Sequence, residues 1–162
     1  TLCNRVSRFS NVVVHAEALG VNEVPHSITA KENSQTNRIV PSTENGGTDI
    51  PLEEVEGTTV DQFLSRLDNP PVGLLKVDTE GFDIMVLEGA ADAMAAGSID
   101  LIVVECTFNL RGAPHVDALE LIAMMRERRY DVVAVYSENV GRFVRGSGHS
   151  DVLFARSLKN TR

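Results

Sequence analysis

The feature that most limits the fold of this chain is an alternation between short apolar runs and longer segments with helical spacing. The runs Leu74–Val77, Leu101–Val104 and Val132–Tyr136 have the length and the branched side chains of buried strands. Between them, apolar residues recur every three or four positions over 82–97 and 118–129. Strands that alternate with helices in this way favour a parallel sheet covered by helices. The sequence therefore predicts the α/β fold class.

The two ends of the chain each add a strand to this pattern. Val12–Val14 is a short β-branched run that we interpret as a buried strand, ending before Gly20. Val152–Ala155 forms the last strand, and residues 138–150 before it contain Gly and Ser but show no helical pattern. Two final strands connected without a helix predict an antiparallel hairpin at the C-terminus.

Two helices have recognisable ends. One is capped by Thr58 or Thr59 and ends before Pro70, and its apolar face consists of Val60, Phe63, Leu64 and Leu67. The other runs from Phe82 to a stop at Gly97, because glycine readily takes the left-handed conformation that ends a helix.

Residues 31–49 form a long polar stretch in which Ile39, Val40 and Pro41 are the only apolar cluster. A connection of this length without secondary structure of its own is unusual in a compact domain. We therefore interpret it as a polar loop insert, either a lid over a site or a disordered segment.

Length, charge and cysteine content exclude several classes of protein. At about 150 residues per domain, 162 residues predict a single domain. No apolar run approaches the roughly 18 residues that cross a bilayer, so no membrane partner is expected. The net charge of −8 gives an acidic surface that repels phosphate backbones, so nucleic acid is not expected either. Cys3 and Cys106 form no disulfide framework, which favours a reduced, cytoplasmic protein.

The first residues predict that the chain begins inside a helix. Leu2, Val6 and Phe9 have helical spacing with nothing ahead of them, and neither an initiator Met nor a signal-peptide pattern is present. We therefore expect a fragment, with residues 1–162 forming a single but partial domain.

Acidic residues follow three of the expected strands. Glu17, Asp78 and Glu105 each come at a strand end, and Glu80 stands at the opening of the helix after Asp78. Because α/β proteins bind ligands at the carboxyl ends of parallel strands, these carboxylates form the candidate site. They can accept a hydroxyl or ammonium group of a ligand. The alternative is that Asp78 and Glu80 only cap the helix from Gly81.

The sequence shows no pattern typical of a zinc site, of an activated serine or cysteine nucleophile, or of a glycine-rich cofactor cradle. No metal site is expected, because ligand-type spacing is absent among His15, His26, His115 and His149. The sequence contains no GxSxG, and neither cysteine has a neighbouring histidine that would activate it. It also contains no GxGxxG and no glycine-rich turn between strand and helix, so the usual cradle for a nucleotide-like cofactor is not in these residues.

One block of the sequence resembles a known family. Residues 74–90, LLKVDTEGFDIMVLEGA, are similar to the hallmark of the FkbM-type S-adenosylmethionine-dependent methyltransferases. The family pattern runs Lys-Ile-Asp-Val-Glu-Gly-Ala-Glu, followed by a helix ending near Leu-x-Gly-Ala. The positions that match it are Lys76, Asp78, Glu80, Gly81, Leu87, Gly89 and Ala90. The positions that depart from it are Thr79, Phe82 and, conservatively, Asp83.

Flanking segments extend the resemblance. Thr59–Leu64 resembles the family's Thr-Leu-Asp segment, Val13–Leu19 resembles its strand leading into an Ala-Leu pair, and Glu105 resembles the acid that closes its next strand. The resemblance covers roughly residues 1–110, and the final hairpin in outline.

The resemblance implies a Rossmann-like class I methyltransferase sheet, truncated at the N-terminus and completed by the C-terminal antiparallel hairpin. The strands should be mainly 74–78, 101–105, 131–137 and 151–155, with 151–155 antiparallel between its neighbours. Strand 12–16 must then pair with the edge of 74–78, lie detached or rely on another chain, because unpaired buried backbone groups are costly. We therefore expect self-association through an exposed sheet edge.

The resemblance also implies methyl transfer from S-adenosylmethionine, by O-methylation of a sugar or small-metabolite hydroxyl. The expected cofactor contacts are Asp78 on the methionine side and, on the adenine side, Glu17, Ala18 and Leu19. A carboxylate near the acceptor can take its proton, with Glu80 the first choice, followed by Asp78 and Glu105. In such enzymes a glycine turn and a ribose-binding acid precede the point where this chain begins, so the chain alone should be inactive.

Two functions of other classes stay open on the sequence. The chain can be a non-catalytic α/β interaction module or a truncated product, which an inability to bind S-adenosylmethionine would favour. It can also be another strand–Asp–helix enzyme, such as a magnesium-dependent lyase or hydrolase of the barrel type, in which Asp78 and Glu80 hold the metal.

Overall fold

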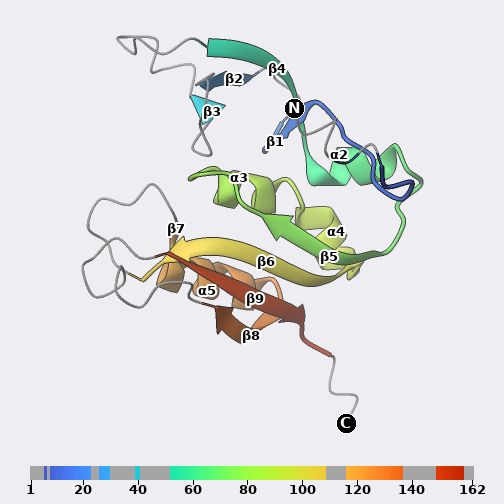
Figure 1. Ribbon diagram of the computed structural model, residues 1–162. Coiled ribbons are helices and arrows are strands. Elements are labelled where there is room, and N and C mark those ends of the chain that lie inside the picture. Colours follow the sequence, from blue (N-terminus) through green and yellow to red (C-terminus); the bar gives the residue numbers. More distant parts are fainter. Residues whose placement is uncertain are drawn as a thin grey trace.

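The computed structural model divides the chain into two sheets with associated helices (Figure 1). It describes residues 6, 8–22, 26–29, 39–40, 52–108, 116–136 and 149–158. Strands and helices within these ranges form a mixed α/β fold, as the sequence predicts. None of the helices in these ranges has the length and apolar character needed to span a bilayer.

The larger sheet is built from the second half of the chain, with the strand order β5-β6-β9-β8 and the short β7 paired to the end of β6. Its strands are β5 (Val72–Val77), β6 (Ile99–Thr107), β7 (Val116–Asp117), β8 (Tyr130–Tyr136) and β9 (Ser150–Arg156). β5 and β6 are parallel, whereas β9 is antiparallel to both β6 and β8. This order confirms the predicted insertion of the last strand between its neighbours. The sheet is mixed and its described strands do not close on themselves, so the barrel-type alternative is wrong.

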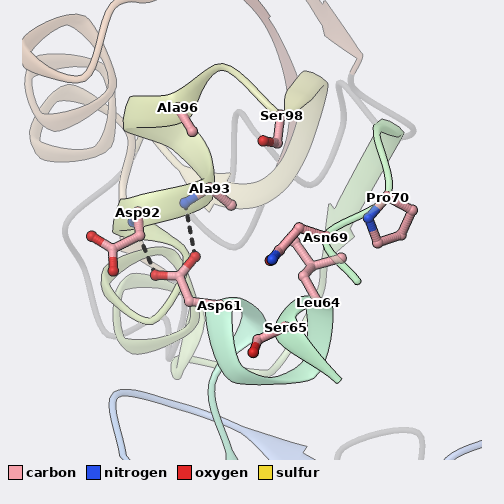
Figure 2. A pocket seen from close by; sticks show the side chains of 9 residues that line it. All are labelled: Asp61, Leu64, Ser65, Asn69, Pro70, Asp92, Ala93, Ala96 and Ser98. Atoms are coloured by element: carbon pink, nitrogen blue, oxygen red, sulfur yellow. Dashed lines mark hydrogen bonds between the residues drawn. The ribbon is translucent and has the colours of Figure 1, made fainter. Parts of the chain in front are cut away.

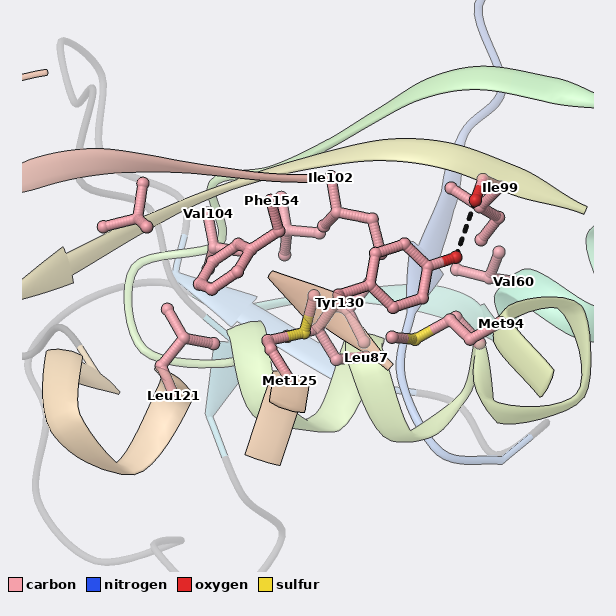
Figure 3. Packing of buried hydrophobic residues seen from close by; sticks show 14 of the residues in the cluster. Val60, Leu87, Met94, Ile99, Ile102, Val104, Leu121, Met125, Tyr130 and Phe154 are labelled. Atoms are coloured by element: carbon pink, nitrogen blue, oxygen red, sulfur yellow. Dashed lines mark hydrogen bonds between the residues drawn. The ribbon is translucent and has the colours of Figure 1, made fainter. Parts of the chain in front are cut away.

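Three helices cover one face of this sheet: α3 (Asp83–Glu88), α4 (Ala91–Ala96) and α5 (Ala118–Glu127). Figure 3 shows their apolar side chains packed against those of the strands. The fully buried members include Leu87, Ile102, Leu121, Met125 and Phe154. Burying a side chain of this size contributes roughly 1.5–3 kcal/mol relative to leaving it exposed. The hydroxyl of buried Tyr130 donates to the Ile99 carbonyl at 2.6 Å, so its polar atom does not oppose burial.

The opposite face of the sheet is more open to solvent. Along β6 and β9, fully buried residues alternate with partly exposed ones, such as Val103 and Leu153. Leu74 on β5 and Tyr136 on β8 are each 55% exposed. Because strand side chains alternate between faces, these residues mark one face that the described helices leave partly uncovered.

The smaller sheet, which the sequence does not predict, has the order β1-β4-β2-β3. Its strands are β1 (Glu17–Leu19), β2 (His26–Thr29), β3 (Ile39–Val40) and β4 (Leu52–Thr58). β1 and β4 are parallel, and β2 is antiparallel to both β4 and β3. β3 belongs to the insert at 31–49, whose other residues lie outside the described ranges.

The strand expected near the N-terminus is wrong in position and in partner. Residues 12–16 form no strand, and Val13 is 75% exposed. The strand begins only at Glu17, and it pairs with β4 rather than with the edge of β5. The valines alone therefore do not define a buried strand, because no neighbouring strand offers them backbone partners. Of the helix expected over residues 1–9, the first five lie outside the described ranges, while Val6 is helical.

The single helix expected over 82–97 is divided into α3 and α4 at Gly89 and Ala90. The Gly89 carbonyl accepts from the Asp61 amide at 2.9 Å, and a Cβ on Gly89 would lie 2.0 Å from the Gly20 carbonyl oxygen. Figure 2 shows the Asp61 carboxylate reaching the backbone amides of Asp92 and Ala93, each at 2.9 Å. It therefore caps α4 from another helix. Gly97 ends α4 in the left-handed conformation, as the sequence predicts.

The remaining described helix, α2 (Val60–Ser65), begins as expected and ends early. Thr59 and Gln62 form a reciprocal capping box, which satisfies two amides of the first turn. Val60 and Leu64 are buried, but Leu67 lies beyond the helix and is 50% exposed. The apolar face is therefore shorter than the sequence pattern suggests.

Candidate functional site

Three of the predicted acids come together at the carboxyl ends of β5 and β6. One carboxylate oxygen from each of Asp78, Glu80 and Glu105 lies within 4.8 Å of the others. Asp78 follows β5, Glu80 stands in the loop before α3, and Glu105 is near the end of β6. We call this group the acid cluster; its three carboxylates lie together at the strand ends, as the sequence argument expects.

The fourth predicted acid, Glu17, lies elsewhere. It is on β1 in the smaller sheet, where both of its carboxylate oxygens accept hydrogen bonds from the guanidinium of Arg66, the shorter at 2.5 Å. Its neighbours on the same strand are Ala18, which is buried, and Leu19, which is half-buried and packs against the core. The acid cluster does not include these three residues.

The loop that carries Glu80 has an unusual backbone. Glu80 has a φ of 53°, and Gly81 has a φ of 102°, so two successive residues are in the left-handed half of conformational space. Residues other than glycine rarely adopt this backbone conformation, because it costs of order 1–3 kcal/mol. Contacts with surrounding groups must therefore hold Glu80 in it.

Asp83 supplies those contacts. Its side chain is 1% exposed, and its carboxylate accepts from the Thr79 amide and hydroxyl, each at 3.1 Å, and from the Gly81 amide at 3.2 Å. The sequence gives Asp83 no role beyond its departure from the family pattern. A short acid at this position can bond back to the loop that precedes it, which is the signal that could have identified it.

The capping alternative for Asp78 and Glu80 is not what the structure contains. α3 begins at Asp83, and its N-cap residue Phe82 makes no side-chain capping bond. The acid that organises the start of this helix is therefore Asp83. Phe82 instead packs its ring edge-on against His26 of β2, with 5.7 Å between ring centroids.

A lysine partly neutralises the acid cluster. Lys76 on β5 donates to Asp78 at 2.5 Å. This hydrogen bond raises the pKa of Lys76 above its ordinary value, and the charges of Asp151 and Glu105 act in the same direction, while burial opposes them. The lysine is therefore a stable cation beside the cluster.

A histidine that directly precedes β9 also reaches the acid cluster. His149 Nε2 lies 3.1 Å from a carboxylate oxygen of Glu105. Its position follows from the antiparallel pairing of β6 with β9, which places Asp151 opposite Glu105. Sequence reasoning set all the histidines aside because it sought metal-ligand spacing, and the local sequence around His149 gives no sign of this partner.

Cys106, next to Glu105, is unsuited to nucleophilic chemistry, in agreement with the sequence. It is fully buried, and its thiol contacts the Ser150 carbonyl at 3.6 Å. Burial first, and then nearby carboxylates, raise its pKa from 9.0 to about 12. Very little of the reactive thiolate is present at neutral pH.

The three carboxylates of the acid cluster are suited to accept hydrogen bonds from a hydroxyl or ammonium group of a ligand. Carboxylate oxygens are also the ligands that magnesium prefers. However, Asp78 already bonds to Lys76 and Glu105 already pairs with His149. Among the described residues, Glu80 is the member of the cluster whose carboxylate has no hydrogen-bond or ion-pair partner.

Comparison with known proteins adds a family to this geometry. The model of the methyltransferase FkbM domain matches residues 4–132 of the chain. The chain belongs to the FkbM methyltransferase family. The same comparisons find no matching curated protein and no matching solved structure. In this FkbM domain the matched range contains Asp78, Glu80 and Glu105, whereas His149 follows it.

Proposed function

We propose that this FkbM domain transfers the methyl group of S-adenosylmethionine to a hydroxyl of a sugar or small metabolite. The observation that carries the proposal is the acid cluster, which lies at the carboxyl ends of two parallel strands in a methyltransferase domain. Ligands of α/β proteins bind at this edge of the sheet.

Glu80 is the residue best suited to receive the acceptor. Its carboxylate is half-buried and unpartnered within the described part of the chain, so it can accept a hydrogen bond from the hydroxyl and then its proton. Asp78 and Glu105 hold Lys76 and His149 beside it. Fixing the hydroxyl oxygen in line with the methyl carbon is the main contribution that such a site makes.

The described residues fit one side of the cofactor. When bound, S-adenosylmethionine supplies an electrophilic methyl carbon on a sulfonium. Asp78 bonds Lys76 through one carboxylate oxygen and is exposed, so its other oxygen can accept from the ammonium of the methionine part. Ala18 and Leu19 offer apolar surface on the adenine side, but Glu17 is already held by Arg66.

We further propose that these strands are the acceptor side of a larger Rossmann-like domain, and that a glycine-rich cofactor cradle lies outside this chain. The chain has no glycine-rich strand-to-helix turn. Within the described ranges the outer edge of β5 has no pairing strand, and one face of the large sheet is partly uncovered. Both features suit a sheet that continues beyond β5.

The test is a methyl-transfer assay with the complete encoded protein, tritium-labelled S-adenosylmethionine and a panel of sugars and small hydroxyl metabolites. We expect label to be recovered as a methyl ether of one class of acceptor. Label transferred only to nitrogen or carbon acceptors, or to none, would contradict the proposal. Calorimetry on the 162-residue chain alone should show weak or no cofactor binding, and micromolar affinity would place the cradle within it.

A further inference from the structure

A pocket lies at the end of the large sheet opposite the acid cluster. It has a volume of about 370 Å³, and we call it the arginine pocket because its wall includes Arg128, Arg129 and Arg156. Arg128 and Arg129 follow α5, and Arg156 ends β9. Arg156 contacts Asp100 on β6, five positions before Glu105, which corresponds to about 17 Å along a strand. The arginine pocket is therefore separate from the acid cluster.

Positive charge is concentrated in this pocket, although the chain as a whole carries a net charge of −8. No carboxylate is among the described residues that line it. The nearby acids already have partners, since Asp100 accepts from Arg156 at 3.4 Å and Asp131 accepts from the Ser157 hydroxyl at 2.5 Å. Arg156 is therefore paired with Asp100, whereas Arg128 and Arg129 have no carboxylate partner among the described residues.

The guanidinium donors are largely unused. Arg128 reaches the Met124 carbonyl of its own helix only at 3.5 Å. The guanidinium of Arg129 has no partner in the described part of the chain. Each guanidinium offers five N–H groups in a fixed planar array, so many donors remain for a ligand.

The backbone holds the arginines around the pocket. Arg129 and Gly97 both have left-handed backbones, with φ values of 67° and 73°. A Cβ on Gly97 would lie 2.3 Å from Nη1 of Arg156, so the absence of a side chain there makes room for this guanidinium. The Ser157 amide donates to the Arg129 carbonyl at 2.7 Å and ties the two arginine segments together.

We propose that the arginine pocket binds the phosphate group of a small phosphorylated molecule. Arginine matches the planar, bidentate geometry of phosphate oxygens better than lysine does. The organic part of the ligand would lie against the apolar wall formed by Met94, Ala96 and Leu158. The volume is within the range of pockets for small ligands.

The test is an NMR titration of the isotope-labelled chain with glycerol 3-phosphate, with glycerol as the uncharged control. We expect saturable shifts of the Gly97, Arg129 and Ser157 amides with the phosphate ester and none with glycerol. Arg129→Gln should weaken binding by about tenfold or more, because it removes a charge-assisted donor. Arg129 is exposed, so its replacement leaves the core intact.

The matched control is Arg126→Gln, which removes an exposed arginine of α5 outside the pocket. We expect this variant to bind as the unmodified chain does. Equal weakening in both variants would mean that binding follows net charge, and shifts that never saturate would mean that no pocket is formed. Either result would overturn the proposal.

Discussion

Asp83 stabilises the backbone on which the candidate site is built. The left-handed conformation of Glu80 persists because the Asp83 carboxylate bonds to the loop on either side of it, at Thr79 and Gly81. Glu80 in turn is the acid of the cluster whose carboxylate has no partner among the described residues. The site therefore depends on a buried residue that is not itself a member of the acid cluster.

Replacing Asp83 should destabilise this loop. In Asp83→Asn one oxygen remains to accept from Thr79, but the amide nitrogen cannot accept from the Gly81 amide. The new side-chain NH₂ is buried and faces the Gly81 amide, donor to donor, so we expect the free energy of unfolding to fall by about 1–3 kcal/mol, the usual result of leaving a buried polar group unpaired. Urea denaturation measures this change. The control Asp92→Asn alters an exposed side chain nearby, and an equal loss there would rule out the loop contacts as the cause.

Cys106 should resist alkylation while the chain is folded. A pKa raised from 9.0 to about 12 lowers the thiolate population at pH 8 about a thousandfold, in addition to the shielding by burial. Iodoacetamide labelling followed by mass spectrometry, in a Cys3→Ser background, measures the rate in native and urea-unfolded chains. Equal rates would show that the thiol is accessible.

The raised pKa of Cys106 also determines how the stability of the folded chain changes with pH. Because the folded state holds the thiol proton more tightly than the unfolded state, the free energy of unfolding should fall as pH rises above about 9. Cys106→Ala should reduce this dependence between pH 9 and 12.

Some site residues follow from local sequence and others do not. Asp78 and Glu105 were predictable as neighbours, because each directly follows an apolar run that reads as a strand, and Glu80 stands two residues after Asp78. His149 was not, because its partner Glu105 is reached only when β9 inserts between β6 and β8. The role of Asp83 depends on loop geometry that spacing does not encode.

At the scale of elements, one acid links two helices. Asp61 belongs to the first turn of α2, yet its carboxylate accepts from the first amides of α4 (Figure 2). Figure 2 also shows the side chain of Asp92 turned away from this contact, although its amide takes part. The break between α3 and α4 is thus compensated from outside.

Removing this cap should loosen α4. We expect Asp61→Ala to lower the free energy of unfolding by about 0.5–2 kcal/mol, as loss of a helix cap does. Asp92→Ala, which keeps the amide and the Asp61 carboxylate, should cost less. If thermal or urea unfolding shows the reverse order, the cap is not what stabilises this helix end.

Helices and strands in which apolar residues recur at regular spacing were easier to predict than elements without such a pattern. Helix α5 and strands β6, β8 and β9 have clear apolar patterns and lie where expected. Strand β4 carries Glu53, Glu54 and Glu56 and little apolar surface, so only its pairing with β1 and β2 reveals it. At the split, Gly89 lies against the Gly20 carbonyl and its own carbonyl accepts from the Asp61 amide, contacts that helical spacing cannot indicate.

At the scale of the whole molecule, the large sheet combines a free edge with a partly uncovered face. β5 pairs only with β6 among the described strands, and Leu74 at its centre is 55% exposed. An unpaired edge with apolar side chains is a template for association with another chain.

We therefore expect the 162-residue chain to self-associate when it is produced alone. Leu74→Lys should shift sedimentation profiles toward monomer, because an edge charge opposes strand pairing. Leu119→Lys, at a 72% exposed position on α5, should leave the profile unchanged. A chain that stays monomeric at high concentration, or responds equally to both changes, would contradict association through β5.

Whether the acid cluster is the site of methyl transfer is tested by comparing turnover with cofactor affinity in the variant Glu80→Gln. The comparison uses the complete protein, the acceptor found by methyl transfer and calorimetry with S-adenosylmethionine. We expect turnover to fall by roughly a hundredfold or more while cofactor affinity changes little, because an acceptor-side proton acceptor is lost. Glu88→Gln, which alters an exposed acid at the end of α3, should leave both unchanged. Unchanged turnover in Glu80→Gln with lowered thermal stability would show that Glu80 is structural and that the acid cluster is not the site of methyl transfer.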